Sequence, residues 1–321
     1  MSSPENTAVI SDRRMASRLR SKGYGRMRGG VLVLAPEETL YLLEKGVIKG
    51  ITPEEFLRMA STPEFDKRYA VYRDLRSRGI VLSAGSRFET QGDRIPRTVI
   101  PTHEREVFSI ASIWEKMEEE ILFSVVDDEG DVTHYRLTPV DLKGEGFDIP
   151  SGVEITVLST LGMVRDPEVA RDLLVGGFFG RRSGSGLTLS LLECAYLGSR
   201  GAVLHRRSRR ISPEACVRRA ALVDRMAHLK YEAYRILRER GLIPRTGFKF
   251  GTHFRVYDRV PEVKREGERT HAPYLVQVVP GHYTATWEEI SRSVRLAHGV
   301  RKKMIFMQVP ERFVMIEWVR P

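Results

Sequence analysis

The stretch Tyr69–Gly79 (YAVYRDLRSRG) occurs a second time as Tyr231–Gly241 (YEAYRILRERG), 162 residues further along the chain. An earlier stretch, Leu34–Gly46 (LAPEETLYLLEKG), also recurs as Leu189–Gly201 (LSLLECAYLGSRG), at an offset of 155. Two long matches in the same order indicate an internal duplication, which sets the architecture of the whole chain. The offset grows by seven, so the second copy contains a small insertion between the two blocks.

The duplication predicts two tandem repeats, 1–150 and 151–321, each of ordinary domain size. The stretch 141–152 (DLKGEGFDIPSG) has the Gly, Pro and polar content of a boundary. Each repeat is expected to consist of an amino-terminal and a carboxy-terminal subdomain. The expected bounds are 1–60 and 66–148 in the first repeat, and 151–215 and 224–321 in the second.

Local signals predict a mixed α/β (α+β) fold. Thr52, Ser190 and Thr286 each have a Glu three residues on, a reciprocal capping pattern at a helix start, and Ser212 precedes a proline. Gly79, Gly241 and Gly299 follow helical patterns and suit left-handed helix caps. Beyond Gly241 the apolar period approaches two, which indicates strands. Each repeat therefore predicts a small helix-and-strand amino-terminal subdomain, followed by a mixed sheet with a helix packed on it.

Composition excludes several classes of protein. Hydrophobic residues make up 41% and charged residues 29% of 321, which is typical of a globular chain. The longest uncharged run, 272–287, is too short and polar to cross a membrane, and residues 1–5 lead into no secretory core. We therefore expect a cytoplasmic protein without a membrane partner. The two cysteines, Cys194 and Cys216, favour buried apolar positions rather than a disulfide.

The net charge of +10 makes a polyanion the first partner to consider. Residues 1–150 hold 22 Lys and Arg against 25 Asp and Glu, a net of −3, whereas residues 151–321 hold 30 against 17, a net of +13. Affinity for a polyanion is therefore predicted for the second repeat alone.

Motifs for metal or nucleophile chemistry are weak. The eight histidines form no HxxxH or HxH pair, and Gly-rich stretches lack the ending of a phosphate loop. Glu262-Val-Lys264, with Asp258 upstream, is the one metal-nuclease signature, and that pattern is common by chance. We expect neither a metal nor a cofactor.

Three separated motifs near the carboxy terminus occur in a specific order: Lys249–Asp258 (KFGTHFRVYD), His271–Val276 (HAPYLV) and Val294–Phe306 (VRLAHGVRKKMIF). Together with the duplicated blocks, they make the whole chain resemble the two-repeat form of the archaeal tRNA-splicing endonucleases, the tRNA-intron lyases. The resemblance implies a homodimer that excises introns from precursor tRNA at bulge-helix-bulge junctions, without a metal.

The resemblance implies a catalytic triad of Tyr257, His271 and Lys302. Tyr257 would take the proton from a ribose 2'-hydroxyl, His271 would protonate the departing 5'-oxygen, and Lys302 would stabilise charge on the phosphoryl oxygens. The products would be a 2',3'-cyclic phosphate and a 5'-hydroxyl. Because the ordinary pKa of tyrosine is near 10, a nearby cation must lower it, and Lys302, Arg255 and Arg301 are the candidates.

The resemblance also implies RNA contacts. Arg295 and Trp318 occupy the positions of a pair that clamps a flipped-out base by stacking, where many members of the family have a second arginine in place of the tryptophan. Trp318 as a core anchor is the alternative. Arg292, three residues before Arg295, would share its helix face, and Arg301 is a further RNA-binding candidate.

The first repeat is predicted to be inactive. At an offset of 162, Ile95 stands where the second repeat has Tyr257, and an alignment at offset 183 puts Glu119 opposite Lys302. Residues 66–148 would thus be a pseudo-catalytic subdomain, and residues 224–321 the catalytic one.

The first repeat also contains an acidic turn, residues 127–131, between two strand-like stretches. In the family, the equivalent loop docks into a basic pocket of the other subunit, which makes it a candidate dimer interface, with a solvated hairpin tip as the alternative. The acidic residues are Asp127, Asp128, Glu129 and Asp131.

Two other functions remain open on the sequence. One is a non-catalytic RNA-binding or structural subunit of a splicing endonuclease, and the other is a metal-dependent nuclease. An intact set of Tyr257, His271 and Lys302 favours the enzyme.

Overall fold

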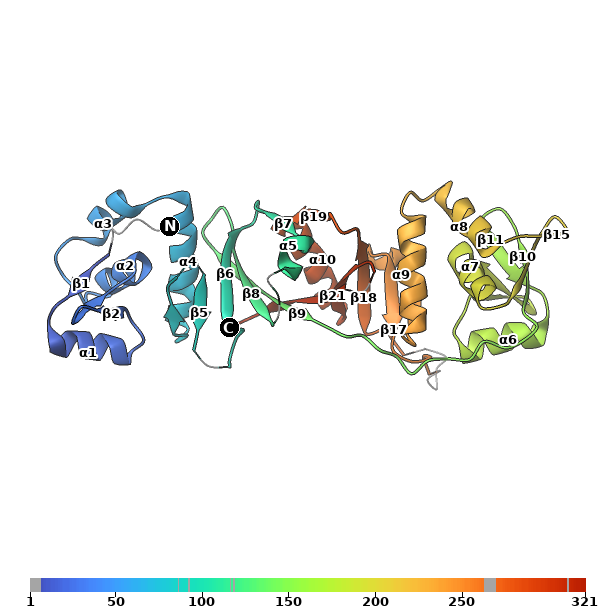
Figure 1. Ribbon diagram of the computed structural model, residues 1–321, viewed down its shortest axis with the longest axis horizontal. Helices are drawn as coiled ribbons and strands as arrows, with labels where there is room; N and C mark the ends of the chain where they lie inside the picture. Colours follow the sequence, from blue (N-terminus) through green and yellow to red (C-terminus); the bar gives the residue numbers. More distant parts are fainter. Residues whose placement is uncertain are drawn as a thin grey trace. The chain divides into compact units, whose positions relative to one another are not determined.

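A computed structural model describes residues 7–85, 87–91, 93–115, 117, 119–262, 270–310 and 312–321. The chain divides into two compact units (Figure 1). The first unit comprises 1–138, 284–292 and 316–321, and the second comprises 139–283 and 293–315. None of the helices in the described ranges is both long and apolar enough to cross a membrane.

The first unit begins with a small subdomain in which a three-stranded sheet of order β1-β3-β2 is joined to helices. Its elements are β1 (Val9–Ile10), α1 (Arg13–Ser21), β2 (Arg26–Arg28), β3 (Val31–Val33), α2 (Pro36–Glu44), α3 (Pro53–Ala60) and α4 (Pro63–Ser77). Helix α4 contacts both α2 and the strands that follow, so it connects this subdomain to the next sheet (Figure 1). One apolar core, which includes Leu32, Leu40 and Tyr72, runs through the unit.

The second part of the first unit is a mixed sheet with strand order β4-β5-β6-β8-β9. Its elements are β4 (Leu82–Ser83), β5 (Phe88–Thr90), β6 (Thr98–His103), β7 (Val107–Ser109), α5 (Ile110–Trp114), β8 (Ile121–Val126) and β9 (Val132–Pro139). Strand β6 pairs in parallel with β8, and the other pairs of known register are antiparallel. Strand β19 (Thr284–Thr286) pairs with β7, which brings the buried Trp287 against Phe108, Phe123 and Tyr135.

The second unit starts with a six-stranded sheet of order β12-β13-β11-β10-β14-β15. Its elements are β10 (Glu154–Val157), β11 (Leu161–Val164), α6 (Pro167–Gly176), β12 (Arg181–Ser183), β13 (Gly186–Ser190), α7 (Leu191–Ser199), β14 (Val203–Arg206), β15 (Arg209–Arg210), α8 (Pro213–Ala221) and α9 (Ala227–Glu239). Helix α9 packs on α7 and α8 and also on the next sheet, as Figure 1 shows.

That next sheet has the order β16-β17-β18-β20-β21. Its elements are β16 (Ile243–Thr246), the 3-10 turn η2 (Phe248–Phe250), β17 (Phe254–Tyr257), β18 (Tyr274–Val279), α10 (Trp287–Gly299), β20 (Lys303–Gln308) and β21 (Arg312–Val319). Strand β18 is parallel to β20 and antiparallel to β17. The order and the observed directions match those of β4-β5-β6-β8-β9, as a duplication predicts, and the fold is the predicted mixed α/β class.

The duplicated blocks make equivalent contacts in the two units. Glu38 accepts hydrogen bonds from the backbone N–H groups of Gly25 and Ala35, and its counterpart Glu193 accepts them from Gly180 and Ser190. A duplicated arginine in α4 and α9 likewise donates to the carbonyl oxygen at the end of α1 or α6: Arg76 to Lys22 and Arg238 to Gly177. The duplicated arginine therefore connects α4 to α1 in the first unit and α9 to α6 in the second.

Most of the predicted helix boundaries are confirmed. Reciprocal capping bonds join Thr52 to Glu55, Ser190 to Glu193 and Thr286 to Glu289. Gly79 and Gly241 have φ values of 81° and 76°.

The prediction for Gly299 is wrong. Gly299 is the last residue of α10, and the left-handed position is taken by Arg301, with φ 54°. The N–H of the next residue, Lys302, donates to the carbonyl oxygen of Ala297 and closes the cap.

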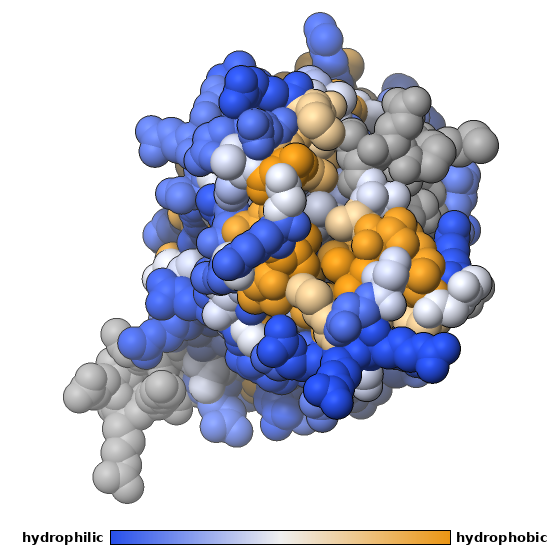
Figure 2. Space-filling view, turned by 90° about the vertical axis from the view of Figure 1, so that its left-hand side faces the viewer, coloured by the Kyte–Doolittle hydropathy of each residue, from blue (hydrophilic) through white to orange (hydrophobic). Residues whose placement is uncertain are grey.

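Figure 2 shows a face over the first amino-terminal subdomain, where apolar side chains gather inside a hydrophilic surround. The large hydrophobic side chains that this subdomain exposes include Val9, Met27, Val47, Ile51 and Met59.

Candidate active site

Three strand ends meet at one edge of the second unit's sheet. Strand β17 ends at Tyr257 and lies antiparallel to β18, whose first residue Tyr274 pairs with Val256. Strand β20 lies parallel to β18 and begins opposite that residue, because Tyr274 pairs with Lys303. The sheet register therefore brings the end of β17, the segment before β18 and the residue before β20 to the same edge, which is where the three predicted catalytic residues lie.

Tyr257 lies on the sheet face opposite α9. Val256 and Phe254 belong to the core that α9 covers, whereas Tyr257 packs in a small apolar cluster with Phe178, Ile243 and Ala272. Only 6% of its surface is exposed. The tyrosine is therefore held by packing and is not a mobile surface side chain.

Lys302 reaches the same cluster. Its ammonium group donates to the carbonyl oxygen of Ala272 at 2.6 Å and lies 5.6 Å from the centre of the Phe250 ring. Partial burial, followed by the positive charge of nearby Arg255, lowers the pKa of Lys302 below its ordinary value. Because Ala272 directly follows His271 and packs with Tyr257, it links all three predicted positions.

His271 is exposed, in the segment just before β18. Upstream of it, the N–H of Thr270 donates to the carbonyl oxygen of Glu262. Lys264, the other half of the weak metal-nuclease signature, lies outside the described residues. Within the described ranges, no three His, Cys, Asp or Glu side chains form a group that could hold a metal ion.

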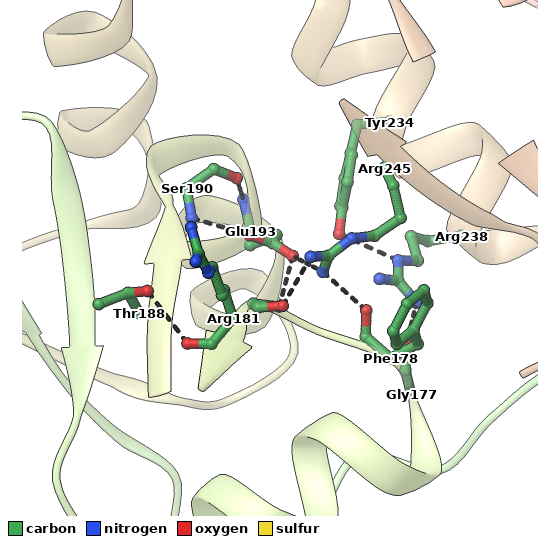
Figure 3. A network of polar contacts seen from close by, with 10 residues as sticks. Gly177, Phe178, Arg181, Thr188, Ser190, Glu193, Tyr234, Arg238 and Arg245 are labelled. Atoms are coloured by element: carbon green, nitrogen blue, oxygen red, sulfur yellow. Dashed lines mark hydrogen bonds and ion pairs between the residues drawn. The ribbon is translucent and has the colours of Figure 1, made fainter. Parts of the chain in front are cut away.

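Sequence reasoning missed a polar network in which Arg245 and Glu193 hold the segment that contains Phe178 (Figure 3). Arg245 of β16 donates to the carbonyl oxygens of Phe178 and Gly180, at 2.9 and 2.6 Å, and forms an ion pair with Glu193 at 3.2 Å. The Arg245 guanidinium also lies 4.8 Å from the centre of the Phe178 ring. The Phe178 ring in turn contacts Tyr257.

The second unit alone has this support. At the offset of 155, the counterpart of Phe178 is Gly23, where an added Cβ would come within 2.2 Å of Val81. At the offset of 162, the counterpart of Arg245 is Ser83. The sequence does contain a signal for this network, because Phe178 and Arg245 replace a glycine and a serine of the first repeat. Only the fold shows that these two residues are in contact.

Strand register corrects one residue of the comparison between the repeats. Leu82 pairs with Thr90 and Pro244 pairs with Val256, so Gln91, not Ile95, stands where the second repeat has Tyr257. The offset of 162 fails here because the paired residues Pro244 and Val256 are four positions further apart in the sequence than Leu82 and Thr90. Pairing of Thr98 with Ile121 and of Leu275 with Met304 places Glu119 opposite Lys302, as predicted. The first repeat lacks both groups.

The predicted RNA-binding residues lie on exposed or half-buried surfaces. Arg295 is exposed on α10, and Arg292 forms an exposed ion pair with Glu288 at 2.9 Å. Arg301 is exposed next to Lys302. Trp318 on β21 is half-buried, and the guanidinium of Arg320 lies 4.8 Å from the centre of its ring. Their role in RNA binding stays a prediction.

The acidic turn between β8 and β9 is built around Asp127, whose carboxylate accepts hydrogen bonds from the N–H groups of Glu129 and Asp131. Asp128 forms an ion pair with Arg105 and lies 3.5 Å from His103. Asp128, Glu129 and Asp131 are exposed. Asp127 therefore shapes the turn, and the other three carboxylates face outward.

Comparison with known sequences assigns the amino-terminal part of both repeats and the carboxy-terminal part of the second repeat. The profile described as "tRNA intron endonuclease, N-terminal domain" matches residues 5–59 and 153–216. The profile described as "tRNA intron endonuclease, catalytic C-terminal domain" matches residues 227–317, the region that contains Tyr257, His271 and Lys302.

The chain is similar along most of its length to curated archaeal proteins named "tRNA-splicing endonuclease". It is 32% identical to that of Methanosarcina acetivorans, covering 94% of this chain and 93% of the relative. It is 33% identical to that of Natronomonas pharaonis, covering 94% of each. The protein of Methanococcoides burtonii is 30% identical, with 93% and 92% covered. With this identity over nearly the whole length, and with the catalytic-domain profile over the sheet edge described above, the chain belongs to the tRNA-splicing endonuclease family.

Proposed function

We propose that this protein excises introns from precursor tRNA, and that Tyr257, His271 and Lys302 of the second repeat carry out the cleavage. The observation that carries the proposal is the sheet register, which brings the three residues to one edge inside the region that matches the family's catalytic domain. The non-catalytic subunit considered from the sequence would have no need to keep the three together.

The chemistry is a transesterification within the RNA. Tyr257 removes the proton of a ribose 2'-hydroxyl, whose oxygen attacks the adjacent phosphorus while the bond to the 5'-oxygen breaks. His271 gives a proton to that departing oxygen. Lys302 stabilises the extra negative charge on the phosphoryl oxygens. The products are a 2',3'-cyclic phosphate and a 5'-hydroxyl, and the reaction consumes no water and needs no metal.

The position of Lys302 suits this role. Its ammonium group is oriented by the Ala272 carbonyl oxygen and is partly shielded from water, so its charge acts through a lower effective dielectric than at the surface. Arg255, on the same sheet face as Tyr257, adds a second positive charge. Both cations favour an anionic transition state.

The assembly that we propose is a homodimer with one active repeat in each chain. The exposed carboxylates Asp128, Glu129 and Asp131 of the inactive repeat would dock against positive charge on the other subunit. A two-fold operator repeats the active site at a fixed spacing, which suits a bulge-helix-bulge RNA with two cleavage sites. Recognition would depend on RNA shape, phosphates and splayed bases. The cytoplasmic location stays a prediction.

Cleavage of a bulge-helix-bulge RNA in EDTA tests the mechanism. The wild-type protein should cut at both junctions and leave cyclic phosphate ends, and His271→Ala should slow the chemical step by about 100-fold or more, since general acid catalysis contributes about 10²–10⁴-fold. Cleavage that stops in EDTA would favour the metal-dependent nuclease. RNA binding without any cleavage would favour the structural subunit.

Charge reversal of Glu129 and Asp131 tests the dimer, because both side chains are exposed and neither forms the turn as Asp127 does. The variant should elute as a monomer from a sizing column. A matched reversal of the exposed Glu54 and Glu64 should leave the dimer intact. An unchanged elution volume for the first variant would mean that the turn is a solvated hairpin tip.

A further inference from the structure

A hairpin in the amino-terminal subdomain of the second unit concentrates positive charge. Strands β14 and β15 form a two-residue hairpin, with His205 opposite Arg210 and Arg206 opposite Arg209. The sequence of this segment is HRRSRR, which places four arginines in six residues. Arg207, Arg209 and Arg210 are exposed.

The hairpin accounts for most of the seven-residue insertion between the two duplicated blocks. Residues 45–52 join α2 to α3, whereas residues 200–212 join α7 to α8. The offset between the repeats is therefore 155 before this connection and 160 at Pro53 and Pro213. Five of the seven residues inserted between the two blocks lie here, and residues 45–52, all of which the structure describes, contain no strand.

The arginines lack acidic partners. Elsewhere in the second unit, arginines such as Arg171, Arg235 and Arg240 pair with carboxylates. In the part of the chain that the structure describes, no carboxylate lies within ion-pair distance of any guanidinium of this hairpin. Instead, the positive charge of Arg219 on α8, followed by desolvation and the charge of Arg207, lowers the pKa of Arg206.

The hairpin is also locally unfavourable. Arg207 and Ser208 have φ values of 47° and 62°, the left-handed conformation that this type of turn requires and that Asn and Gly adopt at least cost. Arg206 and Arg209 face each other across the strands, and like charges in that arrangement are destabilising. Departures from local preference that bring no packing gain are typical of functional sites.

We propose that this basic hairpin, Arg206–Arg210 with Arg219 beside it, binds the phosphate backbone of the substrate RNA outside the bulge-helix-bulge. Arginine guanidinium groups match phosphate oxygens in a bidentate geometry, and unpaired cations release the counterions of a nucleic acid on binding. The hairpin contains no aromatic side chain on which a base could stack, so it contacts the backbone rather than reading sequence. This inference rests on the proposed function for the identity of the RNA.

The hairpin contacts a part of the RNA distant from the cleavage site. It belongs to the six-stranded sheet, and helices α7, α8 and α9 pack against one another between that sheet and strands β16 and β18. Tyr257 lies on the far face of the latter sheet, away from α9. Affinity for long precursor tRNA should therefore depend on the hairpin, and affinity for a minimal substrate should not.

Protection of a sheet edge is the other role that charges on β15 could have, because β15 is an edge strand. Edge protection does not require Arg207 in a strained turn or Arg219 on a neighbouring helix. If it were the only role, loss of the arginines would cause self-association and leave RNA affinity unchanged.

Binding to two RNAs tests the inference. The variant Arg207→Gln/Arg209→Gln/Arg210→Gln is compared with a control of equal charge change, Arg58→Gln/Arg73→Gln/Arg171→Gln, on exposed helix surfaces. The ligands are an intron-containing precursor tRNA with 2'-deoxyribose at both junctions, which cannot be cut, and a short bulge-helix-bulge RNA of the same chemistry. Dissociation constants are measured at several salt concentrations.

The hairpin variant should bind the long RNA about tenfold or more weakly, and the slope of log affinity against log salt should fall by about one for each phosphate that the protein no longer neutralises. Its affinity for the short RNA should change less than twofold. A weakening on the long RNA no greater than that of the control, or an equal weakening on both RNAs, would overturn the inference.

Folding and function are separated by two further measurements. Ser208→Gly keeps every arginine and relieves the left-handed strain, so it should bind the long RNA as the wild type does and melt no lower. If it bound as weakly as the triple variant, loop shape rather than charge would be responsible, and the inference would fail. Absence of cleavage of an unmodified precursor would contradict the proposed function, whereas the binding comparison on the uncut RNA would still decide the role of the hairpin.

Discussion

The ring of Phe178 meets the ring of Tyr257 edge-on, with the two centroids 5.5 Å apart and the planes at 90°. Phe178 adopts a left-handed backbone conformation, with φ 50°, at a position where the first repeat has glycine. For a residue with a side chain, that conformation costs about 1–2 kcal/mol. Arg245 stabilises it by holding the Phe178 carbonyl oxygen and covering the ring. The repeat that we propose to be active thus carries local strain at the residue whose ring packs against Tyr257.

Phe178→Leu should lower the rate of the chemical step by about tenfold and leave the KM for RNA unchanged, because a loosely held base spends less time in line with the 2'-hydroxyl. Single-turnover cleavage measures this directly. Phe56→Leu, which replaces a buried ring in the first unit, is the matched control. It should change the stability of the protein but not the rate of the chemical step. Equal rates for the two variants would mean that the ring contact does not orient Tyr257.

The pH profile of cleavage should report on the pair of cations near the tyrosine. Burial and Arg255 lower the pKa of Lys302. In the mechanism that we propose, Lys302 stabilises phosphoryl charge only while it is protonated. Arg255→Gln removes one of the two causes, so the descending alkaline limb of the profile should move to higher pH. The substrate should carry ribose only at the junction and deoxyribose elsewhere, so that alkali does not cleave the rest of the strand at high pH. Arg235→Gln is the control. An alkaline limb that moves equally in both variants would contradict the assignment of that limb to Lys302.

Local sequence was sufficient for features that depend on neighbouring residues. The capping pairs at Thr52, Ser190 and Thr286 form as predicted, since a side chain and a backbone group three residues apart are fixed by the helix itself. The glycine caps are less local. Gly299 was displaced from the left-handed position because the bond from Lys302 to Ala297 places the cap two residues later.

Features that depend on strand pairing could not be read from offsets. The offset between α4 and α9, extended along the sequence, gives Ile95 as the counterpart of Tyr257, whereas strand pairing gives Gln91. An insertion in a turn changes the number of residues between two strands without changing which residues pair. The contact of Arg245 with Phe178 joins residues 67 apart in the sequence, and no periodicity connects them. The resemblance proposes the triad, but it does not predict that the three positions group around Ala272.

His253 should make stability depend on pH. Burial, followed by the charge of Lys230, lowers the pKa of this histidine to about 4, and its ring accepts a hydrogen bond from the N–H of Val278. Between pH 6.5 and about 4, the unfolded chain binds a proton that the folded chain does not, so stability falls as the pH falls through this range, by up to about 3 kcal/mol. In His253→Gln, the free energy of unfolding of the second unit, measured with denaturant, should no longer fall with pH in this range. The exposed His282→Gln should keep it, and parallel curves for wild type and His253→Gln would exclude the effect.

A buried chain of hydrogen bonds in the first unit should stabilise that unit without serving catalysis. Ser124 contacts His134 Nδ1 at 2.8 Å, and His134 Nε2 contacts an Asp74 carboxylate oxygen at 2.9 Å. The geometry is that of a nucleophile, a base and an orienting acid, yet Ser124 is fully buried and no substrate can reach it. Burial raises the pKa of Asp74, but the hydrogen bonds from His134 and Arg78 outweigh it and bring the pKa to about 2. The carboxylate therefore stabilises the folded state above its unfolded pKa near 4, and this contribution is lost as the pH falls towards 2.

Asp74→Asn should destabilise the first unit by about 1–3 kcal/mol at neutral pH, because it leaves the buried donor of His134 and the exposed guanidinium of Arg78 without a charged acceptor. Amide hydrogen exchange in α4, β8 and β9 should rise, and exchange in the second unit should not. Cleavage by the folded fraction should match the wild type, because the variant residue lies in the repeat that lacks Tyr257 and Lys302. The exposed Asp66→Asn, on the same helix, is the control. Loss of cleavage in a variant that stays folded would show that the inactive repeat contributes to the reaction and not only to the scaffold.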